Sequence, residues 1–221
     1  LGTSMRMVSI NPVFRKMSRL VRDTSRKLKK SINFTTQGED VELDKTVVDH
    51  ISDPLIHLIR NALDHGIESD EQERVAKGKT PKGNISMRAY YKGSDIIIEI
   101  SDDGRGLDKT KIYNKAVEQG IISEDDALSE REVHKLIFHP GFSTVDNVSS
   151  VSGRGVGMDV VKNSIEVLRG NIDISSIVNR GSIFSIKLPL TLAIIETMRI
   201  EVPNDWSSLV ILYSWRNICL V

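Results

Sequence analysis

The spacing of apolar side chains predicts alternating helices and strands, with a strand pair near residue 180. Apolar residues recur at helical spacing over 11–30 and again from Asp44 to Leu63. Gly66 ends the second of these helices, and Pro54 inside it predicts a kink or a restart. Shorter segments alternate apolar and polar residues, as strands with one buried face do. The strands predicted in this way are 32–37, 41–43, 85–91, 96–101 and a hairpin of 171–177 and 182–188, and the remaining helices are 68–77, 108–118, 129–138 and 156–168.

This order of elements indicates an α/β two-layer domain with a mixed sheet. The chain has 221 residues, 39% of them hydrophobic, which is enough for one sizeable core. Its 30 Lys and Arg balance 30 Asp and Glu, so no overall charge favours nucleic acid. No apolar run reaches the length of a membrane span, and the single cysteine, Cys219, excludes an internal disulfide framework and a multi-cysteine metal site. We therefore expect a soluble, intracellular globular domain.

One segment departs from this balance, because 11–30 carries eight basic residues against Asp23. A surface for nucleic acid or for a membrane is one interpretation of such a cluster. A solvated helix face is the preferred one, since charge runs on helices usually face water.

The helix at 55–65 collects polar side chains on one side. At 100° per residue, His57, Asn61, Asp64 and His65 share an arc of about 100°, opposite the apolar positions. An Asn amide oxygen suits Mg²⁺, and a nearby imidazole can orient a ligand or move a proton. The two imidazoles lie about 12 Å apart along the helix, which is too far for one shared metal ion. An ordinary solvated face remains the alternative.

Two glycine-rich segments strengthen the case for a ligand site. Residues 102–106, DDGRG, follow a strongly apolar strand, and a carboxylate there could accept a hydrogen bond from an exocyclic amine such as that of adenine. Residues 153–158, GRGVGM, open a helix, where free backbone amides bind phosphate. Neither a dinucleotide fingerprint nor a phosphate loop of the G-x-x-x-x-G-K-[ST] type is present. Residues 141–144, GFST, lie between the two segments, where a mobile lid would be.

These motifs, taken in order, resemble the Bergerat-type (GHKL) ATP-binding fold. HLIRNALDHGIE, DDGRG, PGFST, VSGRGVGMDVVK and LPLTLAII are similar to the catalytic domain of the bacterial chemotaxis histidine kinases, the CheA family, and the likeness covers about residues 5–200. MRMVSINPVFRKMSRLVRD resembles the end of that family's dimerisation domain.

The resemblance implies an α+β two-layer sandwich. Its mixed, mostly antiparallel sheet would be covered on one face by helices, with an N-terminal helix left from the dimerisation domain. The implied domains are 1–30 (end of the dimerisation domain and linker), 31–192 (ATP-binding catalytic domain) and 193–221 (start of a truncated or divergent regulatory domain).

The resemblance also implies roles for individual residues. Asn61 would hold Mg²⁺ between the nucleotide phosphates, and His57 stands where hydrolytic relatives carry a Glu that activates water. His57 and Asn61 are therefore the expected catalytic residues, with phosphoryl transfer favoured over hydrolysis. Asp102 would bind the adenine amine. The implied cofactor-binding residues are Asn61, Asp64, His65, Asp102, Gly104, Gly106, Lys111, Lys115, Ser143, Thr144, Gly153, Arg154, Gly155, Val156, Gly157 and Met158, with Asn61 as the metal ligand.

The implied activity is transfer of the γ-phosphoryl group of Mg-ATP to a histidine on a separate phosphoacceptor domain. No acceptor pattern is evident, since His50-Ile51-Ser52-Asp53-Pro54 lacks the acid and the proline spacing of a conventional one. The implied setting is cytoplasmic, with a coupling protein, chemoreceptors and response regulators as partners, a possible homodimer, and neither nucleic acid nor membrane insertion. The alternatives are an ATP-hydrolysing relative of the same fold and a nucleotide-sensing interaction module.

Overall fold

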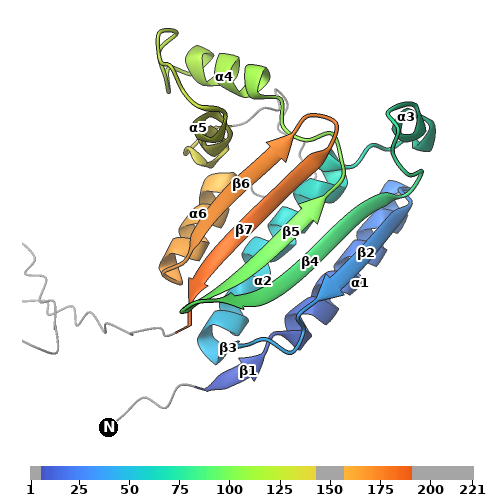
Figure 1. Cartoon of the computed structure of the whole chain (residues 1–221), viewed down its shortest axis with the longest axis vertical. Coiled ribbons are helices and arrows are strands. Elements are labelled where there is room, and N and C mark those ends of the chain that lie inside the picture. The colour runs from blue at the N-terminus through green and yellow to red at the C-terminus, as the bar shows by residue number, and fades with distance from the viewer. Residues whose placement is uncertain (1–5, 143–156, 191–221) are drawn as a thin grey trace, which may run out of the picture. The chain divides into compact units, whose positions relative to one another are not determined.

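The architecture is a five-stranded mixed sheet with helices packed on one face (Figure 1). The computed structural model describes residues 6–142 and 157–190. The sheet has the order β2-β4-β5-β7-β6, in which β2 runs parallel to β4 and the other neighbours are antiparallel. Its strands are β2 (Ile32–Gln37), β4 (Gly83–Lys92), β5 (Asp95–Asp102), β6 (Asn171–Ile177) and β7 (Gly181–Pro189).

Alternation along the strands separates an apolar face from a polar one. Met87, Ile98 and Ile186 point to the same side of adjacent strands and are fully buried. On the other side, Arg88 forms an ion pair with Glu99 across the β4–β5 pair. A sheet with one apolar and one polar face buries only the first, which explains the two-layer architecture.

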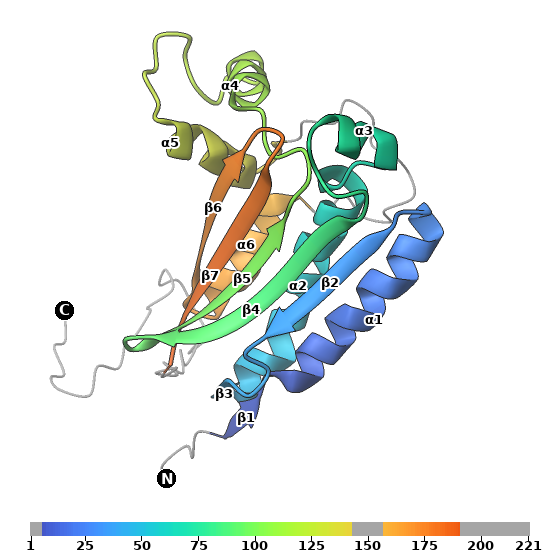
Figure 2. The ribbon, with the colours of Figure 1, turned by 45° about the vertical axis from the view of Figure 1, so that its right-hand side comes forward.

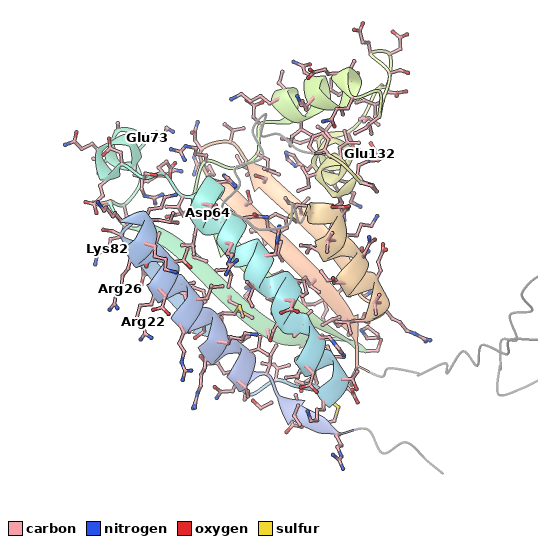
Figure 3. All side chains as sticks on the ribbon, turned by 180° about the vertical axis from the view of Figure 1, so that it is seen from behind. Arg22, Arg26, Asp64, Glu73, Lys82 and Glu132 are labelled. Atoms are coloured by element: carbon pink, nitrogen blue, oxygen red, sulfur yellow. The ribbon has the colours of Figure 1, made fainter. Side chains whose placement is uncertain are left out.

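Three helices cover the apolar face. They are α1 (Asn11–Leu28), α2 (Lys45–Asn61) and α6 (Met158–Val167), and they lie side by side across the sheet, with α2 in the middle (Figure 3). Helix α1 turns Val13, Phe14, Met17 and Val21 inward and leaves Arg22 and Arg26 in solvent (Figure 3). Its apolar stripe therefore belongs to the same core as the sheet. The boundary placed after residue 30 stays a prediction.

A small antiparallel pair, β1 (Met7–Ser9) with β3 (Glu42–Asp44), joins the start of α1 to the start of α2. The side chain of Asp44 caps α2 by accepting a hydrogen bond from the backbone N–H of Thr46 at 2.8 Å. Helix α2 then runs unbroken through Pro54, so the predicted restart does not occur.

The remaining helices lie near one end of the sheet (Figure 2). They are α3 (Glu71–Ala76), α4 (Lys109–Glu118) and α5 (Glu130–Lys135), which is followed by a 3-10 turn at Leu136–Phe138. Helix α5 begins with a complete capping box between Ser129 and Glu132. No helix of the described ranges has the length and apolarity to cross a membrane.

Candidate functional site

A cavity of about 380 Å³ opens where the end of α2, the end of β5 and the start of α6 meet. Because these elements carry the motifs singled out in the sequence, the fold brings distant segments to one place. The lining residues are His57, Asn61, Ala62, His65, Gly66, Asp102, Gly106, Leu107, Ile137, Phe142, Gly157, Met158, Ser182 and Phe184.

A π-helical turn at Ala62–Gly66 continues α2 and decides which side chains reach the cavity. The backbone N–H of Ile67 bonds to the carbonyl of Ala62, five residues earlier, at 2.8 Å. This wider turn holds about one residue more than an α-helical turn, so later side chains rotate backwards. His65 consequently lines the cavity, whereas Asp64 does not. The described lining thus includes His65 and not Asp64, whose predicted part in binding stays a prediction.

The end of this turn is held by a buried lysine that follows α1, the helix beside α2 on the same face of the sheet. The ammonium group of Lys30 donates to the carbonyls of Leu63, Asp64 and Ile67. Burial, the largest influence, lowers the pKa of Lys30, while the carboxylate of Asp64 opposes this effect. Lys30 therefore supplies donors to carbonyls that the irregular end of the helix leaves open.

Asp102 is the buried carboxyl group of the cavity, with 8% of its surface exposed. Burial raises its pKa to about 6, with a smaller push from neighbouring Asp103, against hydrogen bonds from the backbone N–H groups of Gly104 and Ser182. The Gly104 N–H lies 2.9 Å from the Asp102 Oδ1 atom. A side chain at position 104 would put its Cβ 2.2 Å from the carbonyl oxygen of Gly66, so only glycine fits there. The carboxyl group faces the cavity with room for a hydrogen-bond donor.

His57 and Asn61 lie one turn apart on α2 and both line the cavity. Burial, helped by the nearby charge of Arg60, lowers the pKa of His57, so the imidazole is neutral at neutral pH. The Asn61 amide nitrogen donates to the Met158 sulfur at 3.1 Å. This contact leaves the amide oxygen of Asn61 without a hydrogen bond among the described residues.

The start of α6 forms the other wall. Gly157 is the residue before the first turn, and no side chain of the described residues caps it. The first backbone N–H groups of α6 are thereby open to an anion, and the helix dipole favours negative charge there. The predicted residues Gly153, Arg154, Gly155 and Val156 lie outside the described residues, as do Ser143 and Thr144.

The predicted lysines of α4 are not brought to the cavity. Neither Lys111 nor Lys115 lines it, and Lys115 forms an ion pair with Glu118 at 3.1 Å. Gly104 likewise stands behind the cavity wall, whereas Gly106 lines it. The predicted binding residues thus fall into two groups, those that line the cavity and those that do not. The roles of both groups in binding stay predictions.

Sequence reasoning missed most of the apolar wall and one hydroxyl group. Ser182 and Phe184 come from β7, and the register pairs Ser182 directly with Asp102. The alternation of apolar and polar residues over 182–188 could have predicted that Ser182 faces inward, because it shares a face of the strand with buried Ile186 and Leu188. Leu107, Ile137 and Phe142 follow from no periodicity, since they lie in loops and a short turn.

No group of three or more His, Cys, Asp or Glu side chains able to hold a metal ion exists within the described ranges. A metal here would have to take most of its ligands from water or from a bound molecule. Mg²⁺ does this commonly, since it uses one or two protein oxygens together with phosphate oxygens.

Known proteins share both the sequence and the fold of this chain. Residues 50–192 match the family described as histidine kinase-, DNA gyrase B-, and HSP90-like ATPase. Over 91% of the chain, 52% of residues are identical to the sensor histidine kinase CheAY of Helicobacter pylori and 49% to the chemotaxis protein CheA of Rhizobium meliloti. The chain spans only about a quarter of the length of these curated relatives, 25% and 26% respectively.

Among solved structures, the nucleotide-free catalytic domain of the histidine kinase ThkA is similar, with a TM-score of 0.55 and 18% identity. The likeness covers 85% of this chain and 97% of that one, which confirms the predicted α+β fold. The likeness to CheA proteins predicted from the motifs is also confirmed. The chain therefore belongs to the histidine kinase-, DNA gyrase B- and HSP90-like ATPase family, and within it is similar to the catalytic domain of CheA.

Proposed function

We propose that this chain binds ATP with Mg²⁺ in the cavity and delivers the γ-phosphoryl group to a histidine on a separate phosphoacceptor domain. The observation that carries this proposal is the convergence of Asp102, Asn61 and the open start of α6 on one cavity. A carboxyl group, an amide oxygen and the backbone N–H groups at the start of α6, uncapped by any side chain of the described ranges, match the three parts of the ligand, which are an amino-purine, a metal ion and phosphates.

The base end of the cavity combines one polar group with an apolar slot. The Asp102 carboxylate is placed to accept a hydrogen bond from the adenine amino group, and Ile137 and Phe142 supply apolar surface for the ring. Ligand sites are commonly built in this way, with a few polar groups that set orientation within an apolar lining.

At the phosphate end, we propose Asn61 as the protein ligand of Mg²⁺. Its amide nitrogen is engaged by the sulfur of Met158, so the oxygen is the atom left for the metal. When bound, Mg²⁺ neutralises charge on the phosphates and fixes their geometry. Met158 and Gly157 begin α6, whose backbone N–H groups would hold the phosphate oxygens.

His57 favours transfer over hydrolysis in this proposal. A neutral imidazole on α2 can orient the transferred phosphoryl group or accept a proton, but it lacks the charge of a carboxylate base. We expect slow turnover without an acceptor and rapid turnover with one.

The similarity to CheA proteins supports further proposals about the setting. We propose that the protein acts in the cytoplasm with a coupling protein, chemoreceptors and response regulators. We also propose that residues 1–30 are the end of a dimerisation domain with its linker and that 193–221 are the start of a truncated or divergent regulatory domain. Neither nucleic acid nor a membrane surface is part of this proposal.

Calorimetric titration with a non-hydrolysable ATP analogue, with and without Mg²⁺, tests the site. Micromolar binding that Mg²⁺ strengthens supports it, and no binding by a cooperatively folded sample contradicts it. Incubation with labelled ATP and a separate phosphoacceptor domain tests the reaction. Label on the acceptor histidine supports transfer. Fast hydrolysis without an acceptor indicates a hydrolase, and binding without either reaction indicates a nucleotide-sensing module.

A further inference from the structure

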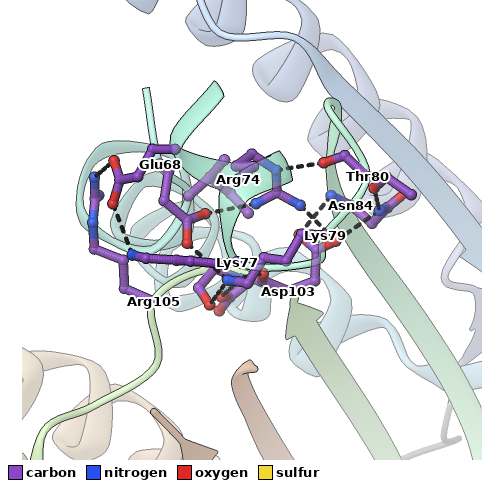
Figure 4. A network of polar contacts seen from close by, with 12 residues as sticks. Glu68, Arg74, Lys77, Lys79, Thr80, Asn84, Asp103 and Arg105 are labelled. Carbon is purple, nitrogen blue, oxygen red and sulfur yellow. Dashed lines mark hydrogen bonds and ion pairs between the residues drawn. The ribbon is translucent and has the colours of Figure 1, made fainter. Parts of the chain in front are cut away.

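A network of four charged side chains, three of them buried and Asp103 half-buried, joins the α3 region to the loop after β5 (Figure 4). Arg74, in α3, bonds to Glu68 at 2.6 Å and to Asp103 at 2.8 Å. Lys79, just after α3, bonds to the second oxygen of Glu68 at 2.7 Å. Arg74 and Glu68 are almost completely buried, and Lys79 exposes 10% of its side chain.

The same network reaches the loop that carries Asp102. The ammonium group of Lys79 donates to the carbonyl oxygens of Asp103 at 2.8 Å and of Gly104 at 2.6 Å. The Asp103 carboxylate accepts from Arg74 and from both the backbone and the side chain of Asn84. The carbonyl oxygens of Asp103 and Gly104 and the Asp103 carboxylate are thereby attached to α3, to the turn that follows it, or to β4.

The front of this loop holds the cavity wall in place. The backbone N–H of Arg105 bonds to the carbonyl of Gly66 at 2.8 Å, which joins the loop to the end of α2. The N–H of Gly104 bonds to the Asp102 carboxyl group at 2.9 Å. A shift of residues 103–105 would therefore move the Asp102 oxygens and the Gly66 contact together.

Stability alone does not explain so many buried charges. A buried ion network is often no more stabilising than apolar residues of similar volume, because removing charges from water is costly. Burial by itself raises the pKa of Glu68, but hydrogen bonds from Lys79 and Arg74 outweigh it and lower that pKa. The network does provide several directional hydrogen bonds to one loop. Such bonds fix the orientation of the loop, and a binding group on it is thereby held in position.

We propose that Lys79 and Arg74 are positioning residues for the nucleotide base, so that α3 acts as a strap on the Asp102 loop without any of its residues lining the cavity. The inference rests on the proposed nucleotide site. It assigns a function to α3, and it separates the two acidic residues of the DDG motif. Asp102 faces the ligand, whereas Asp103 anchors the loop.

The test compares Lys79→Met with Lys82→Met, a matched control. Lys82 is an exposed lysine three residues later, whose ammonium group has no hydrogen bond or ion pair within the described part of the chain. We expect Lys79→Met to raise the Kd of the non-hydrolysable ATP analogue about tenfold, the loss typical of one charge-assisted anchor. The ratio of the Kd without Mg²⁺ to the Kd with Mg²⁺ should stay at its wild-type value, because Asn61 is unchanged. Lys79→Arg should recover most of the affinity.

Amide hydrogen exchange of the ligand-free protein gives a second reading. Lys79→Met should speed exchange at Gly104 and Arg105 by about tenfold while the centre of β5 stays protected. If Lys79→Met does not fold, Glu68→Gln with Lys79→Met removes both charges of one pair and keeps Arg74 with Asp103, and the same exchange is measured there.

The outcomes separate the two proposals. Unchanged affinity and unchanged exchange in a folded Lys79 variant overturn the positioning role. An equal loss in Lys82→Met, or a change in the ratio of the Kd values measured without and with Mg²⁺, overturns it as well. If the wild type does not bind the analogue, the proposed function fails, and faster exchange confined to Gly104 and Arg105 still supports the strap as a structural device.

Discussion

At the scale of single residues, the carboxyl group of Asp102 is buried, and burial disfavours its charged form. Its pKa of about 6 compares with an ordinary value of 3.8. Between these two values the folded chain binds more protons than the unfolded one. The free energy of unfolding therefore falls as the pH rises from about 4 to 6, and this contribution is constant above that range.

Asp102→Asn should remove this penalty. We expect the variant to be more stable than the wild type at pH 8 by at most about 3 kcal/mol and nearly equal to it at pH 3.5, since one pKa unit is worth about 1.4 kcal/mol. Nucleotide affinity should fall because an amide that uses its oxygen for the Gly104 and Ser182 N–H groups points its NH₂ at the adenine amine. Urea unfolding at both pH values and calorimetry measure the two effects, with exposed Asp125→Asn as control. Equal stability at pH 8 would contradict the buried charge.

Asn61 allows a second prediction at this scale. Asn61→Ala should lose most of the Mg²⁺-dependent gain in analogue affinity, about tenfold or more, because it removes the proposed metal oxygen. Affinity without Mg²⁺ should change little. Titrations with and without the metal decide the matter, with exposed Asn163→Ala as the control variant. A full Mg²⁺ effect in folded Asn61→Ala would exclude this residue as the ligand.

The residues that meet in the cavity could be predicted from the sequence where a motif determines the local backbone conformation. Asp102, Asn61 and Gly106 were predicted to belong to one site, and they do meet in one cavity. Lys111 and Lys115 lie on α4, away from the cavity, and nothing in their spacing carried that information. Their placement depends on loops around α4, which have no periodic pattern.

At the scale of elements, the junction between α2 and its π-helical turn is stabilised by the ammonium group of Lys30. Lys30→Met would leave three carbonyls without their charged donor. We expect a loss of about 2–4 kcal/mol in the free energy of unfolding, because orphaned buried acceptors keep their desolvation cost. Denaturant unfolding measures this loss, and Lys27→Met, on the exposed side of α1, should stay near the wild-type value. Similar values for the two variants would show that water replaces the lysine.

Strands and long helices were predicted well because their side chains follow simple periods. The hairpin of β6 and β7 and the alternating β4 were evident from sequence, as was α1. The π-helical turn was not, since a regular wheel assumes one rotation per residue throughout. The π-helical turn depends on tertiary contacts, which a local pattern does not reveal. These contacts are the hydrogen bonds from Lys30 to its carbonyls and the close approach of Gly66 and Gly104.

At the scale of the whole molecule, the main body of the described chain is a five-stranded sheet with one layer of three helices, α1, α2 and α6, on its apolar face. The apolar surface of α1 is packed in the core of the same chain, since Phe14 and Met17 expose at most 1% of their surface. An isolated amphipathic helix would offer such a stripe to a second copy. Here the stripe is occupied, and the exposed side of α1 is strongly basic, which disfavours self-association through it.

We therefore expect a monomer or a weak dimer at micromolar concentration. Sedimentation velocity at low and high salt measures this directly. Association through the basic side would have to overcome like-charge repulsion, which salt screens, so a dimer formed through that side should be stronger at high salt. A tight dimer at micromolar concentration would show that a surface other than the inner stripe of α1 mediates pairing.

The two-layer fold class was within reach of the sequence because the order of elements and the amphipathic patterns agree with each other. The strand order was not, since β2 joins β4 in parallel and β7 inserts between β5 and β6. Such crossovers depend on contacts between distant segments. The pairing of Ser182 with Asp102 is one result of them, and it places a hydroxyl group in the cavity.

The π-helical turn at Ala62–Gly66 has a consequence for genetic variation. Loss of a single codon within it would let the turn close as a regular α-helix, but it would also move the carbonyl oxygens of Leu63 and Asp64 that Lys30 holds. His65 would turn away from its place at the cavity. Such an in-frame deletion should therefore lower nucleotide binding and the free energy of unfolding together, and a screen for stability alone would already detect it.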